Sequence, residues 1–412
     1  MTIDCFADHA ALPYYDALDD ELVVAGVRLS EHARNAGRTP FYIYARDVVL
    51  KKLAELGAAL PEGVALHYAI KANPLPALVT FIAQHVDGLD VASAGELKIA
   101  LASGTRPENI SFAGPGKRDE ELRAAVAAGI TVNIESEFEM RRLDRIGAEL
   151  GKRPRAAIRV NPDFELKSSG MKMGGGPKQF GIDAERVPDA LRAFRVLGLE
   201  FCGFHIYCGS QNLRPDAICD AQRNAVELGL RLAADAPSAV RVLNIGGGFG
   251  VPYFPGERAL DLQPIGANLA VLVERLEREM PDAELTLELG RYLVSEAGLY
   301  VCRVLERKTS RGQVFLICDG GLHQHLAASG NFGQVIRKNY PVAVGNRLRG
   351  APREVASVVG PLCTPLDLLA DRMEMARAQV GDLIVVFQSG AYGFSASPLG
   401  FLSHPAPLEL LA

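Results

Sequence analysis

The sequence predicts an α/β protein made of a closed barrel of eight parallel strands, the (β/α)8 or TIM barrel, and a second, mostly β domain. Between about residues 64 and 290, short apolar strands alternate with amphipathic helical segments, which is the pattern that builds parallel sheets. Eight strand–helix units in fewer than about 250 residues fit a closed barrel better than an open sheet. After Arg291 the helical spacing fades and strand-like runs take over.

The predicted barrel strands are short apolar runs bounded by turn-forming or small polar residues. They are Val64–Ile70, Gly88–Ala92, Asn109–Phe112, Thr131–Glu135, Ala156–Val160, Phe201–Tyr207, Val240–Ile245 and Glu284–Leu289. The segments between them carry apolar residues three and four positions apart and are predicted helices. Examples are Asp119–Ala128, Ser136–Leu150 and Gly266–Met280.

The second domain is predicted from strand-like runs late in the chain. These runs are Tyr300–Leu305, Gln313–Cys318, Glu354–Val359 and Leu383–Phe387. The first 40 residues hold only brief apolar pieces and no helix long enough to close a unit of their own, so we expect them to pack onto the β domain. The predicted domains are therefore 41–293 for the barrel, and 1–40 with 294–412 for the β domain.

Charge and hydropathy narrow the choice of ligand. A formal net charge of −5 over 412 residues gives no basic stripe for nucleic acid and no polybasic surface for an anionic membrane. The first ten residues carry acids where a secretory signal carries positive charge, and no apolar run is long enough to cross a bilayer. We expect a cytoplasmic protein that binds a small molecule, with no nucleic-acid or membrane partner.

The seven cysteines are odd in number and include no close C-x-x-C pair, so they predict neither a disulfide framework nor a zinc site. We expect reduced thiols, most of them small core residues, and no metal. They are Cys5, Cys202, Cys208, Cys219, Cys302, Cys318 and Cys363.

Lys71 stands at the end of the first predicted barrel strand. Strand alternation puts it on the same face as His67 and Ala69, which we take as the inner face. A lysine at the C-terminal mouth of a barrel strand is well placed to form a Schiff base. The alternative is an ordinary surface lysine at a strand end.

Three consecutive glycines, Gly246, Gly247 and Gly248, follow the seventh predicted strand. Their bare backbone can bring several amide groups onto a phosphate, and barrel enzymes commonly hold phosphate at this position. A tight strand-to-loop turn is the alternative explanation.

On the eighth predicted strand, Glu288 alternates with leucines and so points into the barrel near its C-terminal rim. A buried carboxylate needs a cationic partner. A protonated pyridine nitrogen would supply one, and Arg291 could then pair with a phosphate through two hydrogen bonds. A structural ion pair between Glu288 and Arg291 is the alternative.

These residues belong to a set of motifs that occurs in one known order. The set is Y-A-I-K-A-N-P (68–74), G-L-D-V-A-S-A-G-E-L (88–97), G-P-G-K (114–117), N-I-E-S (133–136), F-G-I-D (180–183), N-I-G-G-G-F-G (244–250) and E-L-G-R-Y-L-V (288–294). With it, nearly the whole chain resembles the diaminopimelate, ornithine and arginine decarboxylase family of fold-type III pyridoxal-phosphate enzymes. The resemblance implies decarboxylation of an amino acid at Cα, with pyridoxal 5'-phosphate as cofactor, by a homodimer with shared active sites.

The resemblance also implies roles for single residues. Lys71 looks like the lysine that forms the imine with the cofactor, and Glu288 like the partner of the pyridine nitrogen. Cys363, in G-P-L-C-T-P-L-D (360–367), matches the cysteine that reaches the neighbouring subunit's active site, where it could protonate Cα. Further cofactor contacts are implied for Ser210, Gly246, Gly247, Gly248, Gly290, Arg291 and Tyr392.

The chain departs from the family at the residue that stacks on the cofactor ring. Family members usually read H-x-H-I-G-S-Q there, whereas this chain reads His205-Ile-Tyr207-Cys-Gly-Ser-Gln. Without a gap, Tyr207 takes the stacking position and His205 lies two residues earlier on the same face. Either side chain could cover the ring, or His205 is an ordinary hydrogen-bonded core histidine.

A second departure concerns the substrate. After the active-site cysteine the family often has an acid that binds a distal amino group, but this chain has Thr364. Without that acid a terminal ammonium loses its expected partner, so a distal carboxyl, amide or carrier-linked acyl group fits better. The C-T-P-L-D segment and the run 394–404 are similar to exopolysaccharide- or exosortase-associated decarboxylases, and related enzymes act on amino acids linked to a carrier protein.

Two other functions are compatible with the barrel. Amino-acid racemases share the barrel-plus-β plan but usually place arginine at the pyridine nitrogen, so Glu288 argues against them. A non-catalytic pyridoxal-phosphate-binding protein would generally lack a second domain, so residues 295–412 argue against that function.

Overall fold

Eight parallel strands close into a barrel in the computed structural model, which describes residues 8–165, 171–172, 174–350 and 352–412. Each strand pairs with the next, and the last pairs with the first. The strands are β5 (Val64–Ala69), β6 (Gly88–Val91), β7 (Ile110–Phe112), β8 (Thr131–Ile134), β9 (Arg155–Asn161), β12 (Glu200–Ile206), β14 (Val242–Gly247) and β15 (Glu284–Leu289). The predicted barrel is confirmed, and each observed strand begins and ends within two residues of its predicted position.

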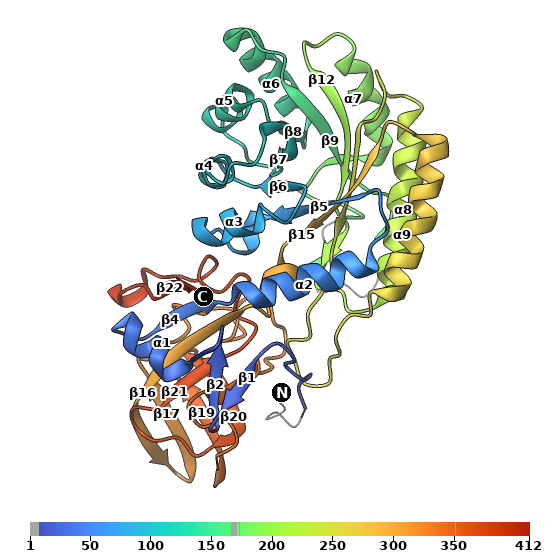
Figure 1. Cartoon of the computed structure of the whole chain (residues 1–412). Helices are drawn as coiled ribbons and strands as arrows, with labels where there is room; N and C mark the ends of the chain where they lie inside the picture. The colour runs from blue at the N-terminus through green and yellow to red at the C-terminus, as the bar shows by residue number, and fades with distance from the viewer. Residues whose placement is uncertain (1–7, 166–170, 173, 351) are drawn as a thin grey trace. The chain divides into compact units, whose positions relative to one another are not determined.

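Helices lie outside these strands, as Figure 1 shows for α4 to α9. The helices from Arg46 to Glu279 are α2 (Arg46–Ala59), α3 (Pro76–Ile82), α4 (Ala94–Ala102), α5 (Asp119–Ala128), α6 (Glu137–Leu150), α7 (Val187–Phe194), α8 (Pro215–Ala233) and α9 (Gln263–Glu279). Short elements between them are η1 (Ile70–Ala72), η2 (Pro107–Asn109), η3 (Ala184–Arg186), β10 (Met171–Lys172), β11 (Ile182–Asp183) and β13 (Gly209–Ser210).

Local sequence explains where the best-defined barrel helices begin and end. Helix α6 begins after Ser136, whose Oγ accepts a hydrogen bond from the Glu139 amide at 3.1 Å, and α4 begins after Ser93 in the same way. Such caps satisfy amides that have no partner inside the helix. Helices α5 and α6 end at Gly129 and Gly151, which take positive φ angles of 80° and 63°, a conformation that glycine adopts without strain.

The second unit is mostly β, as predicted. One path of its sheet runs β18-β21-β16-β17-β19-β20, and β4 pairs with both β16 and β22. These strands are β4 (Phe41–Tyr44), β16 (Gly298–Ser310), β17 (Gln313–Cys318), β18 (Val342–Val344), β19 (Arg353–Val359), β20 (Leu368–Ala376), β21 (Leu383–Val386) and β22 (Leu408–Leu411). Its other elements are β1 (Asp16–Leu18), β2 (Glu21–Val24), β3 (Val27–Arg28), α1 (Leu29–Ala36), α10 (Arg291–Val294) and η4 (Phe401–Ser403).

The chain divides into two compact units. One, which we call the β unit, comprises Met1–Lys52, Val251–Ala259 and Arg291–Ala412, and the other, the barrel unit, comprises Leu53–Gly250 and Leu260–Gly290. The domain boundaries at residues 41 and 293 stay a prediction. No helix within the described ranges combines the length and the apolar character that crossing a bilayer requires.

Candidate active site

Lys71 follows β5 and lies in the short helix η1 rather than in the strand. The strand stops at Ala69 because the chain turns, with the Asn73 amide donating a hydrogen bond to the Ile70 carbonyl at 3.0 Å. The Nζ atom of Lys71 lies 3.2 Å from Oε1 of Glu288, and the Lys71 side chain is 41% exposed. The amine is therefore held beside a carboxylate but remains open to reaction.

Glu288 is the buried member of this pair, with 6% of its surface exposed. It lies on β15, in register with His67 of β5. His205 donates a hydrogen bond from Nε2 to Oε2 of Glu288 over 3.0 Å. Burial alone would raise the pKa of Glu288, but the Lys71 charge, the His205 hydrogen bond and the more distant Arg159 hold it well below its usual range. The carboxylate is therefore kept ionised.

Tyr207 lies just beyond β12, the strand that carries His205. The Lys71 Nζ is 5.3 Å from the centre of the Tyr207 ring. Gly246 approaches the ring so closely that a Cβ at this position would lie 2.7 Å from Tyr207 Cδ2. The structure thus brings Lys71, Glu288, His205 and Tyr207 together at the end of the barrel strands.

The three glycines after β14 are needed because other groups pass close to them. A Cβ on Gly247 would lie 2.5 Å from the Glu288 carbonyl oxygen, while Gly246 and Gly248 take positive φ angles of 68° and 76°. Larger residues would displace β15 or the Tyr207 ring. Gly290 is also closely packed, since its Cβ would lie 3.0 Å from the Ala69 carbonyl oxygen. A tight turn therefore explains Gly246 to Gly248 in part, and it leaves their role in phosphate binding as a prediction.

Ser210 lies in β13, which pairs in antiparallel fashion with β10. Its side chain is half-buried. The short β13 follows Tyr207 by two residues, which places Ser210 on the same connection as the predicted stacking residue.

In the β unit, Arg291 and Tyr392 lie close together, and their role as cofactor contacts stays a prediction. The Arg291 guanidinium lies 4.7 Å from the centre of the Tyr392 ring and donates a hydrogen bond from Nη1 to the Tyr253 hydroxyl over 3.1 Å. Its Nε atom is buried without a hydrogen-bond partner among the described residues. Burial by itself would lower the pKa of Arg291. The interactions with Tyr253, Tyr392 and Tyr340 outweigh burial, so the pKa lies above its usual value. Arg291 therefore keeps its charge and a donor for an anion.

Tyr253 and Tyr340 were missed by the sequence analysis. Their rings lie 4.7 Å apart, and the Tyr253 hydroxyl also hydrogen-bonds Ser295 Oγ at 2.6 Å. Tyr253 lies three residues after the end of the glycine-rich run 246–250, and that position was the available signal. Tyr340 lies in a segment far from any motif, so the sequence offered no signal for it.

Cys363 is exposed on the loop between β19 and β20. The loop is anchored by Asp367, whose two carboxylate oxygens accept hydrogen bonds from the amides of Leu322 at 2.6 Å and Leu362 at 2.7 Å. The other described cysteines are buried, and burial raises the pKa of Cys208 to about 12. Cys5 lies outside the described residues. Among the described thiols, Cys363 is the one placed to react.

Two buried polar networks inside the barrel unit were also missed. Arg159 pairs with Glu135 over 2.8 Å. In the second network His67 Nδ1 lies 3.2 Å from Asp90 Oδ1, which also accepts a hydrogen bond from Ser111 at 2.5 Å. Asp90 and Glu135 stand in the motifs at 88–97 and 133–136, so the motifs marked the positions without showing their partners. No group of three potential metal ligands occurs among the described residues.

These residues fit pyridoxal 5'-phosphate, which offers an aldehyde, a ring nitrogen and a phosphate. Within the barrel unit, Lys71 supplies an amine and Glu288 a buried carboxylate, while His205 Nδ1 is buried with no hydrogen-bond partner in the described part of the chain. The aldehyde and the ring nitrogen lie at opposite ends of the pyridine ring. The direct ion pair between Lys71 and Glu288 therefore has to open before both side chains can engage the cofactor.

A barrel with an amine and an ionised carboxylate facing each other at its mouth, joined to a β unit, defines a fold-type III pyridoxal-phosphate enzyme. The model of the family "Pyridoxal-dependent decarboxylase, pyridoxal binding domain" matches residues 46–295. The chain belongs to the pyridoxal-dependent decarboxylase family.

Relatives of known name support this assignment over nearly the full length. The chain is 40% identical to the L-glutamyl-[BtrI acyl-carrier protein] decarboxylase of Niallia circulans, over 90% of this chain and 88% of that protein. It is 33% identical to the 2-[(L-alanin-3-ylcarbamoyl)methyl]-2-hydroxybutanedioate decarboxylase of Staphylococcus aureus, over 89% of this chain and 92% of that protein. The crystal structure of diaminopimelate decarboxylase from M. jannaschi shares the fold, with a TM-score of 0.88, 24% identity, and coverage of 97% of this chain and 93% of that one.

Proposed function

We propose that this protein uses pyridoxal 5'-phosphate to remove the α-carboxylate of an amino acid as carbon dioxide. The observation that carries the proposal is the buried Glu288 carboxylate, held ionised opposite the Lys71 amine. When bound, the cofactor accepts the electron pair that remains at Cα after carbon dioxide leaves, and it does so best with its ring nitrogen protonated.

Each residue then has a distinct task. Lys71 would hold the cofactor covalently through Nζ and would release it when the amino group of the substrate takes its place. Glu288 keeps a proton at the ring nitrogen because it is an ionised, buried carboxylate. His205 orients Glu288 through the 3.0 Å hydrogen bond. We propose Ser210, Gly246, Gly247, Gly248, Gly290, Arg291 and Tyr392 as the further cofactor contacts.

Cys363 is proposed as the acid that protonates Cα after decarboxylation. Its side chain is exposed on a loop in which Asp367 accepts hydrogen bonds from the amides of Leu322 and Leu362, so the loop is held in a defined conformation. We propose that it does so in a homodimer, where each subunit lends Cys363 to its neighbour. A cysteine thiol is one of the side-chain groups that can act as a general acid when positioned at the reacting atom.

The substrate is proposed to lack a free distal ammonium. Thr364, the residue after Cys363, carries no charge to pair with such a group. The names of the two relatives describe a glutamyl group on a carrier protein and an amide of a substituted alanine, and neither name includes a free distal amine. A distal carboxyl, amide or carrier-linked acyl group is the class of substrate we propose.

A racemase is the competing function for this fold. Racemization would need a base to remove the Cα proton and an acid to return a proton to the opposite face, with the carboxylate retained. An unprotonated ring nitrogen would favour that outcome. Glu288, ionised and buried, favours the protonated nitrogen and therefore decarboxylation.

The test is carbon dioxide release by the purified protein with free and carrier-linked amino acids, read together with the chirality of the recovered amino acid. We expect carbon dioxide and an amine of matching mass. Inversion without carbon dioxide would establish the racemase instead. Lys71→Ala should abolish the visible absorbance of the bound cofactor, because Lys71 is the amine placed to form the imine, and an unchanged band would contradict the role of Lys71.

A further inference from the structure

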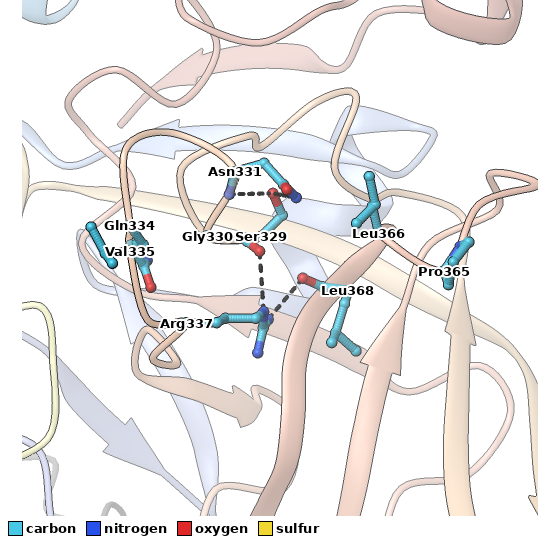
Figure 2. A pocket seen from close by; sticks show the side chains of 9 residues that line it. All are labelled: Ser329, Gly330, Asn331, Gln334, Val335, Arg337, Pro365, Leu366 and Leu368. Carbon is cyan, nitrogen blue, oxygen red and sulfur yellow. Dashed lines mark hydrogen bonds between the residues drawn. The ribbon is translucent and has the colours of Figure 1, made fainter.

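A surface pocket of about 230 Å³ lies in the β unit, between the segment that precedes β18 and the segment that enters β20 (Figure 2). One wall carries Gln334 and Val335 and the other carries Leu366. Ser329 and Arg337 lie between these walls. The lining contains one cation, Arg337, and no acid. We call this hollow the Arg337 pocket.

The Arg337 guanidinium is held by neutral acceptors. Its Nε donates to the Ser329 carbonyl oxygen at 3.1 Å, Nη1 donates to Asn339 Oδ1 at 2.8 Å, and Nη2 donates to the Leu368 carbonyl oxygen at 2.8 Å. Across the described ranges, no carboxylate forms an ion pair with it. Burial lowers the pKa of Arg337, and the charge of Asp371 offsets burial only in part. The charge is therefore fixed in position and only partly compensated.

A guanidinium has five N–H groups, so one on each terminal nitrogen remains for a ligand after these three bonds. Two terminal N–H groups match the two oxygens that a carboxylate or a phosphate presents. Arg337 is half-buried, and the charge of Asp371 offsets its burial only in part, so an anion in the pocket would lower the remaining cost of burying the charge.

The other lining residues add a fixed donor and an apolar rim. Gln334 uses its Oε1 atom to accept a hydrogen bond from the Lys338 amide at 2.7 Å, which leaves its NH2 group as a neutral donor. Ser329 Oγ is fixed by the backbone and side-chain nitrogens of Asn331 at 3.3 Å and 2.9 Å. Val335 is 100% exposed and Leu366 is 58% exposed, so both can cover an aliphatic chain.

We propose that the Arg337 pocket binds a phosphate or carboxylate group carried on a short aliphatic arm. The inference rests on the proposed function and extends it. Pro365 and Leu366 of the pocket wall directly follow Cys363 and Thr364, so an arm bound here belongs to a substrate whose reacting end lies near Cys363. The anion is either a side-chain carboxylate of a free amino acid or a phosphate in the arm that joins an acyl group to a carrier.

The test is calorimetric titration of the full-length, cofactor-loaded protein with propyl phosphate, butyrate and 1-propanol. Loading with cofactor occupies the cofactor's own phosphate contacts. We expect an anion to bind and 1-propanol not to bind, because the pocket offers a charge. Tighter binding of propyl phosphate assigns the carrier arm, and tighter binding of butyrate assigns a free side-chain carboxylate.

Val335→Asp and Val335→Asn form a matched pair. The side chain is wholly exposed, so neither change disturbs packing, but only aspartate adds a negative charge that repels the ligand. We expect Val335→Asp to weaken anion binding by at least about tenfold and Val335→Asn to leave it near the wild-type value. Arg337→Gln should abolish binding, and the valine pair keeps the test valid if that variant folds poorly.

Three results overturn the inference: no anion binds the wild-type protein, Val335→Asp and Val335→Asn bind equally well, or Val335→Asp alone splits a dimer into monomers. The last result would show that a second copy covers the pocket. Failure of the proposed function would look different, since carbon dioxide release would then be absent while anion binding persisted. Carbon dioxide release without anion binding would contradict the inference about the Arg337 pocket and leave the proposed decarboxylase function standing.

Discussion

His205 donates a hydrogen bond from Nε2 to the Oε2 atom of Glu288 over 3.0 Å. The sequence left open whether His205 or Tyr207 stacks on the cofactor ring. The hydrogen bond to Glu288 favours a different role for His205, namely holding the carboxylate in place. Tyr207, in contrast, packs against Gly246 and lies 5.3 Å from the Lys71 Nζ. We infer that Tyr207 covers the cofactor ring and that His205 positions Glu288.

Tyr207→Leu should therefore weaken cofactor binding. Loss of an aromatic ring that stacks on the pyridine removes about 1.4 kcal/mol, which corresponds to a roughly tenfold higher dissociation constant. Tyr207→Phe keeps the ring and should bind nearly as well as the wild-type protein. Absorbance titration of the cofactor-free protein with pyridoxal 5'-phosphate measures both values. Equal dissociation constants for the leucine and phenylalanine variants would assign the ring contact elsewhere.

Glu288→Gln should slow decarboxylation far more than it weakens cofactor binding. Glutamine keeps a hydrogen-bonding group beside His205 but cannot hold a proton on the ring nitrogen by charge. We expect kcat to fall by roughly 10²- to 10³-fold, the range for loss of one preorganised electrostatic group.

The matched control is Glu284→Gln, at the exposed start of the same strand. It removes an equal charge from β15 without touching Lys71 or His205, so kcat should stay near the wild-type value. If the two variants lost activity equally, the effect would reflect the net charge of the strand rather than a contact with the cofactor.

Cys363→Ala should lower kcat with the cofactor absorbance intact. Removal of a positioned acid typically costs about 10²-fold or more in rate. Iodoacetamide should inactivate the wild-type protein at one site, because Cys363 is exposed whereas the other described cysteines are buried. Mass spectrometry of the labelled peptide identifies the site, and the alanine variant should keep its residual activity during the same treatment. Unchanged kinetics of Cys363→Ala would remove the thiol from the reaction.

Much of the barrel could be predicted because its signals are local. Each strand is a short apolar run between turn residues, and the register that closes the ring follows from the parallel βα pattern. Lys71, Glu288 and the three glycines could be singled out because strand alternation and position after a strand decide where such groups point. The length of β5 was overestimated, since a turn from Ile70 to Asn73 looks the same as a strand in an apolar sequence.

Other features could not be read from the sequence because they depend on distant residues. Strand β20 begins with three apolar residues followed by two adjacent charged ones, which is no alternating pattern, and its place is set by pairing with β19. The rings of Tyr253 and Tyr340 pack together although 86 residues separate them in the sequence. Arg337 lies in none of the motifs, and its three neutral acceptors come from residues that only the fold brings around it.

Acid should destabilise the β unit through His325, which is fully buried. Its Nδ1 accepts a hydrogen bond from the Ala328 amide at 3.2 Å, and its Nε2 lies 2.8 Å from Ser389 Oγ. Burial lowers the pKa of His325 to about 3, whereas an unfolded chain has a histidine pKa of about 6.5. Its ring neighbours carry no charge at neutral pH; they are Tyr42, Tyr300 and Tyr340.

The direction of the effect follows from these two values. Below about pH 6.5 the histidine binds a proton in the unfolded chain but stays neutral in the folded protein. The free energy of unfolding therefore falls as the pH drops from about 6.5 toward about 3, by up to about 1.4 kcal/mol per pH unit. His325→Gln can still donate to Ser389 but does not titrate, so its urea midpoint should fall less steeply between about pH 7 and 5. The exposed His85→Gln should follow the wild-type slope. Parallel pH profiles for the wild-type protein and His325→Gln would show that another group governs the acid sensitivity.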